Sequence, residues 1–248
     1  MSPGGTTRLA RIGLWGGIAL LTAIGVTAAT ARATFPADLA RRVDPLRARL
    51  LAYLDVADPL AARRPAEVQR FDGPFAAHPR LTLLHVVPGG LFLALAPLQF
   101  SSRLRDRHRQ LHRWSGRVLV LAAVLSVLPG LFFGLLMPFG GGTEAIAIAV
   151  FGGLFLAAIG RAVVAIRTGQ VALHREWMIR AFAIAIGIST VRVAGAVFDL
   201  ALTPLGVNPR DVFVMSVWTG WITTLGAAEL WIAYTRPRAA PVAYRRAG

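Results

Sequence analysis

The sequence predicts an all-α fold, a polytopic integral membrane helix bundle with about six transmembrane helices. Hydrophobic residues make up 55% of the 248 residues and charged residues only 16%, with a mean hydropathy of +0.58. A soluble globule of this composition would have too little polar surface to cover itself. Apolar stretches of about 20 residues, the length that crosses a bilayer, recur along the chain with charges at their ends. We therefore expect the lipid bilayer to surround most of the chain.

The first apolar stretch, 12–31, lies within an expected N-terminal transmembrane anchor, residues 1–33. Arg8 precedes this stretch, and the small residues around Arg32 resemble a signal-peptide cleavage site, so a cleaved signal is the alternative. The stretch is long for a signal peptide, which favours a retained anchor.

Three further regions follow the anchor. Residues 34–80 are expected to form an extracytoplasmic loop, 81–234 a five-helix membrane domain, and 235–248 a basic cytoplasmic tail. The five spans of the membrane domain are expected at 81–100, 118–137, 144–166, 177–198 and 211–234.

The distribution of Arg predicts the orientation. All 27 basic residues are Arg. The connections after the second and fourth spans and both chain ends are rich in Arg, whereas the connections 138–143 and 199–210 contain only Arg210. Positive charge in short connections marks the cytoplasmic side. The sequence thus predicts a bacterial inner-membrane protein with cytoplasmic termini, and this topological cause of the charge argues against nucleic acid as a partner.

Apolar residues recur at helical spacing in the 34–80 loop, among charged residues. This pattern predicts an amphipathic helix, either on the outer membrane surface or as a solvated linker helix. The apolar positions are Leu39, Val43, Leu46, Leu50, Tyr53 and Leu54.

The chain contains no Cys, which excludes disulfides, iron–sulfur clusters and cysteine nucleophiles. A metal would have to be held by His, Met or oxygen ligands. Hydrolase and zinc sites have no support in the spacing of the remaining residues.

Two similar segments open the third and fifth spans. Leu-His-Arg at 111–113 and again at 173–175 precedes an apolar run, as expected for two related hairpins. Equivalent positions place His112 and His174 at the same depth on the same side. Two opposed imidazoles in a helix bundle are typical axial ligands of haem b. The alternative is that both His residues are interfacial anchors beside Trp114 and Trp177.

Guanidinium groups near this His pair are candidates to neutralise haem propionates. They are those of Arg113, Arg117 and Arg180. Gly116 lies one turn beyond His112, where a missing side chain would admit a porphyrin edge.

A second group of ionisable residues lies near the opposite end of the bundle. His85 is one turn inside the second span, and Arg192 lies within the fifth, where an unpaired cation is costly. The two residues are candidates to hold a quinone head group. Alternatively, Arg192 pairs with Asp199 on the same helix face. Glu229 is a lone acid near the inner end of the last span, suited to proton transfer or to a helix contact.

Several motifs follow one another between residues 78 and 234. They are His78-Pro79, His85, the segment 96–100, His112-Arg113 with Gly116-Arg117, and the segment 174–180. In this order they resemble an uncharacterised family of bacterial predicted membrane proteins, a domain-of-unknown-function family, and that resemblance implies no particular activity. Paired His in a four-helix core is also remotely similar to transmembrane b-type cytochromes, although His85 has no obvious His partner for a second haem.

The leading functional hypothesis is therefore a redox-linked membrane protein that binds haem b or quinone and passes electrons to a membrane redox partner. A non-enzymatic transporter or an assembly or scaffold subunit is the alternative. The sequence leaves enzymatic activity and oligomeric state open.

Overall fold

The computed structural model describes residues 3–236, with side chains from residue 12 onward. This part of the chain is helical and contains no strand, which confirms the predicted all-α fold. Its elements are α1 (Pro3–Thr34), α2 (Leu39–Tyr53), η1 (Ala61–Arg63), α3 (Arg64–Ala77), α4 (Pro79–Gln99), α5 (Ser102–Arg107), α6 (Arg109–Leu136), α7 (Gly142–Arg167), α8 (Val171–Leu202), η2 (Thr203–Leu205) and α9 (Pro209–Thr235).

Five helices are long and apolar enough to cross a membrane, namely α1, α4, α6, α7 and α8. The sixth expected span corresponds to α9, which has 27 residues and packs along α8 but is not among those five. The helices α6 and α8 begin earlier than the apolar pattern predicts, because the Arg- and His-containing segments before the apolar runs are also helical. The chain is thus a polytopic membrane helix bundle.

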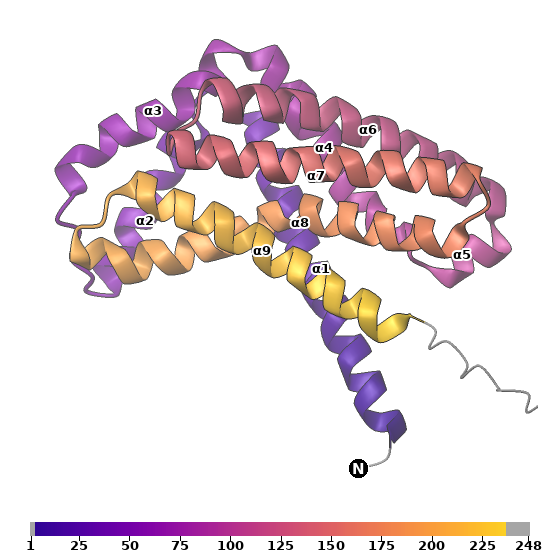
Figure 1. The fold of residues 1–248 in the computed structure, drawn as a ribbon. Coiled ribbons are helices and arrows are strands. Elements are labelled where there is room, and N and C mark those ends of the chain that lie inside the picture. Colours follow the sequence, from indigo (N-terminus) through magenta and orange to yellow (C-terminus); the bar gives the residue numbers. More distant parts are fainter. Residues whose placement is uncertain (1–2, 237–248) are drawn as a thin grey trace, which may run out of the picture.

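Four helices form a closed ring in which α4 packs on α6, α6 on α7, α7 on α8, and α8 on α4. In this ring α6 and α8 lie diagonally opposite each other, as do α4 and α7. Phe92 of α4 and Phe155 of α7 meet across the centre with their ring centroids 6.1 Å apart. Outside the ring, α9 packs on α8, and α1 packs on α4 and α8. Figure 1 shows the N-terminal part of α1 projecting away from the other helices.

The segment from α2 to α3, residues 39–77, lies at the end of the bundle where α8 ends and α9 begins (Figure 1). We call this segment the cap and that end of the bundle the cap end. The connections 100–108 and 168–170 lie at the opposite end, which we call the Arg-rich end. The helix expected in the loop is confirmed as α2. Its apolar face is exposed, with Leu46 61% and Tyr53 85% accessible, so contact of this face with a membrane surface stays a prediction.

Candidate functional site

His174 lies in the first turn of α8 at the Arg-rich end. Its Nδ1 lies 2.9 Å from the carbonyl oxygen of Ala162 on α7. Because a carbonyl only accepts hydrogen bonds, Nδ1 carries a proton and donates it, and the tautomer with this bond has its lone pair on Nε2. A His that ligates a metal is commonly held in this way, through its other ring nitrogen.

His112 lies in the first turn of α6, diagonally across the ring from α8. Its Nδ1 is buried and has no hydrogen-bond partner within the described residues. Its surroundings are cationic, since the groups whose charge acts on it are His174, Arg105 and Arg113. The structure therefore brings the two imidazoles into electrostatic range and leaves a buried ring nitrogen of His112 unsatisfied.

The three Arg residues expected near the His pair have different environments. Arg113 and Arg117 are exposed, and the Arg117 guanidinium lies 4.9 Å from the Trp114 ring centroid. Arg180 is already neutralised, because it donates to both carboxylate oxygens of Glu229 at 2.6 and 2.8 Å. The description of Glu229 as a lone acid was thus wrong: it pairs with a neighbouring helix. The position of Gly116 faces Gln99, whose Oε1 would lie 3.7 Å from an added Cβ.

At the cap end, His85 of α4 lies against α6. Its Nδ1 is 2.8 Å from the Ser126 carbonyl oxygen, and the Ser126 hydroxyl donates back to the His85 carbonyl at 2.7 Å. Gly130 makes room for the ring, since a Cβ there would lie 2.8 Å from Cε1 of His85. As for His174, Nδ1 donates to a carbonyl, and the tautomer with this bond has its lone pair on Nε2.

Arg192 is exposed on α8 and donates to the carbonyl of Ile188, one turn earlier, at 2.9 Å. It makes no ion pair with an acid among the described residues. The alternative that Arg192 pairs with Asp199 was wrong, because Asp199 instead binds Arg47 and Arg64 of the cap. His85 lies within electrostatic range of Arg192. The sequence pattern missed the true partners of Asp199 because they lie far away in the chain.

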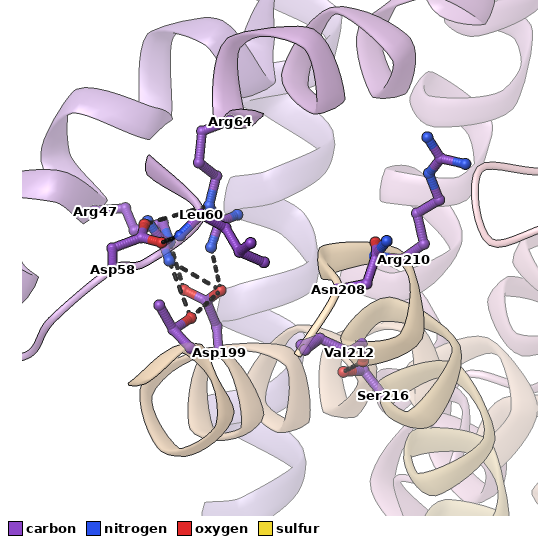
Figure 2. Close-up of polar contacts among 10 residues, drawn as sticks. Arg47, Asp58, Leu60, Arg64, Asp199, Asn208, Arg210, Val212 and Ser216 are labelled. Carbon is purple, nitrogen blue, oxygen red and sulfur yellow. Dashed lines mark hydrogen bonds and ion pairs between the residues drawn. The ribbon is translucent and has the colours of Figure 1, made fainter. Parts of the chain in front are cut away.

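The contacts of Asp199 form a cluster that joins the cap to α8 (Figure 2). Arg47 donates to Asp199 and also, at 2.8 Å, to Asp58, while Thr203 donates to Asp199 at 3.2 Å. Burial alone would lower the pKa of Arg47, but its bonds to Asp199 and Asp58 outweigh this and raise the pKa. Arg47 therefore stays charged across the whole accessible pH range, and the cluster persists wherever the carboxylates are ionised.

Two further ion pairs hold the cap. Arg210 at the start of α9 donates to both oxygens of Glu67 at 2.8 and 2.9 Å. Arg32, near the end of α1, donates to Asp72 at 2.8 Å, and both side chains are buried. Asp72 also accepts from the backbone N–H groups that begin α2. The cap is therefore bound separately to α1, α8 and α9.

No group of three or more His, Asp or Glu side chains within the described residues has the arrangement of a metal site. A haem needs only two axial protein ligands, so this finding leaves the His112–His174 pair as the site to be tested.

Comparison with known families finds a match over residues 82–232 to the family described as predicted membrane protein (DUF2306). The chain belongs to the DUF2306 family. The match runs from the first turn of α4 to the last turns of α9, so the DUF2306 region contains the four-helix ring with α9 and excludes α1 and the cap. Comparisons with curated proteins and with solved structures find no match.

Proposed function

We propose that this DUF2306 protein is a redox-linked protein of the bacterial inner membrane that holds haem b between His112 and His174 at a cytoplasmic Arg-rich end. The observation that carries this proposal is the pairing of a His whose Nε2 is free with a buried imidazole nitrogen that has no partner. The two residues come from diagonal helices of a four-helix ring, the arrangement in which bundles commonly enclose a cofactor.

The side chains around His112 and His174 have the chemistry that a haem b site needs. His174 would supply Nε2 to the iron, and the Ala162 carbonyl would fix its ring orientation through Nδ1. The imidazole of His112 would supply the opposite ligand. Arg113, which already acts electrostatically on His112, would neutralise a propionate. Arg105 also acts on His112, but it lies 3.5 Å from the carboxylate of Asp106 and would have to exchange that partner for a propionate. Arg180 is less suited to that role because Glu229 occupies it.

Haem b, when bound, would supply one-electron transfer, and the surrounding protein would set its reduction potential. The cationic surroundings of His112 would favour the reduced haem, which carries one more electron. The apolar ring, which includes Phe92 and Phe155, excludes water from the centre of the bundle. A membrane redox partner would deliver or accept the electron.

The test is a reduced-minus-oxidised optical spectrum of detergent-purified full-length protein, expressed with ample haem. We expect a b-type spectrum in the wild type and its loss in His112→Ala/His174→Ala. The matched control is His108→Ala, an exposed His at the same end that caps α6. A colourless wild type would contradict the proposal and favour a transporter or scaffold subunit. A spectrum that survives the double substitution would also contradict it, because His112 and His174 would then not be the haem ligands.

A second candidate is a quinone site at the cap end, supported by the free Nε2 of His85 and the Arg192 guanidinium without an acid partner. An imidazole and a guanidinium are suitable partners for the carbonyl oxygens of a quinone head group. Quinone extracted with wild-type protein but lost from Arg192→Gln would support this site. Equal quinone content in both proteins would rule out a quinone site that depends on Arg192.

A further inference from the structure

A groove lies between α7 and α8 near the Arg-rich end, with a volume of about 530 Å³. Pockets that hold small ligands commonly have volumes of about 300–1,000 Å³. Its walls are almost entirely apolar and include Ala157, Val164 and Leu173. Gly160 opens onto it, since a Cβ at this position would have no atom within 4 Å. The groove therefore suits an extended hydrocarbon chain.

The groove also contains a cation whose charge no acid balances. Arg161 lines it, is exposed, and makes no ion pair within the described residues. It lies six residues before the end of α7, which places it about 9 Å from that end along the helix axis. An exposed guanidinium at this depth is costly in hydrocarbon unless it reaches the interface or meets an anion.

Trp177 defines the polar boundary of the groove. The guanidinium groups of Arg161 and Arg180 lie 5.2 and 4.7 Å from its ring. Glu229 neutralises Arg180, so Arg161 is the one of the two that remains uncompensated. A Trp beside an unpaired Arg is typical of the lipid headgroup level. An apolar groove thus leads directly to a cation at the depth of the phosphates.

We propose that this groove binds an anionic phospholipid from the leaflet at the Arg-rich end. The phosphate contacts Arg161, and one acyl chain lies along Gly160 and Val164. Basic pockets between transmembrane helices hold acidic headgroups by this combination of charge and apolar contact. The site is independent of the His pair and does not require haem.

The experiment is lipid binding to purified full-length protein, measured by native mass spectrometry with added phosphatidylglycerol or phosphatidylcholine. We expect Arg161→Gln to weaken phosphatidylglycerol binding about fivefold, the equivalent of one basic contact at a membrane surface. Phosphatidylcholine binding should weaken less, because the choline cation offsets the charge of its phosphate. Gly160→Leu should fill the groove and weaken the binding of both lipids. The matched control Arg109→Gln removes another exposed Arg at the same end, one without an ion pair among residues 12–236, and should have no effect.

An equal loss in Arg161→Gln and Arg109→Gln would show that binding follows net charge and would overturn the proposal. Competition with inorganic phosphate distinguishes binding of a lipid from binding of a free anion. Displacement of phosphatidylglycerol by millimolar phosphate would show that the site binds phosphate alone, which would also overturn it. Retention of the lipid in phosphate, with loss in Gly160→Leu, would support binding of the whole lipid.

Discussion

Replacing Asp199 by Asn should detach the cap from α8. Asp199 accepts hydrogen bonds from Arg47, Arg64 and Thr203, and its side chain is only 21% exposed. Removal of one partner from a buried ion pair costs about 3–5 kcal/mol, and a hydrogen bond to a charged group contributes about 1.5–3 kcal/mol. Because Asp58 still binds both Arg residues in the variant, we expect the cap to lose about 2–3 kcal/mol.

A loss of that size raises the open population of the cap about 30- to 150-fold. Hydrogen exchange of peptides from α2 and α3, measured in detergent, reports this population when reclosing is fast. The matched control is Asp38→Asn, directly before the cap, because among the described residues Asp38 pairs with exposed Arg41 and Arg42 and with no residue of α8. The Arg42 hydrogen bond holds the pKa of Asp38 below its usual range, so the control also removes a full charge at neutral pH. Unchanged exchange in Asp199→Asn, or equal acceleration in both variants, would refute the idea that this cluster fastens the cap.

Three other predictions concern stability and orientation. Asp72→Asn removes the partner of buried Arg32 and should destabilise the contact between the cap and α1 by about 3–5 kcal/mol, seen as accelerated exchange at the start of α2. Gly220→Ala should destabilise the α8–α9 contact by about 1–3 kcal/mol, measured by thermal unfolding, because the added Cβ would lie 2.6 Å from the backbone nitrogen of Val191. The control Gly226→Ala adds a Cβ where no atom lies within 4 Å and should leave the stability unchanged. The chain has no Cys, so a single introduced Cys can be labelled selectively. An impermeant thiol reagent applied to intact cells should label Leu205→Cys at the cap end and should not label Ser102→Cys at the Arg-rich end. The reverse pattern would contradict a cytoplasmic Arg-rich end.

The helices were readily predicted because hydrophobic length is a local property of the chain. Each expected span lies within or close to an observed helix, and the early starts of α6 and α8 arise where charged residues continue a helix beyond its apolar part. The hydrogen bond of His174 was harder to predict, because its acceptor is the backbone carbonyl of Ala162 on another helix, and the sequence does not show which backbone carbonyl a side chain meets. Each copy of Leu-His-Arg has its His at the fourth residue of a helix, and equal membrane depth of the two His residues stays a prediction. The repeat does not indicate which nitrogen of each ring is free.

The ion pairs of the cap were the least predictable part. Asp199 follows Arg192 by seven residues, so helical spacing alone favoured that pair over Arg47, which is 152 residues away. In the folded protein Arg47 of α2 and Arg64 of α3 contact Asp199 near the end of α8. A single sequence gives no measure of that contact.

The position of the acids explains why Arg has different roles at the two ends of the bundle. Of the 12 acidic residues, only Asp106, Glu176 and Glu229 lie at the Arg-rich end. At the cap end, acids form ion pairs with Arg32, Arg47 and other arginines, and these pairs connect different helices. At the Arg-rich end, acids are scarce and already engaged, which leaves guanidinium groups available for external anions. The proposed haem propionates beside His112 and the proposed lipid phosphate beside Arg161 both depend on this same shortage of internal acids.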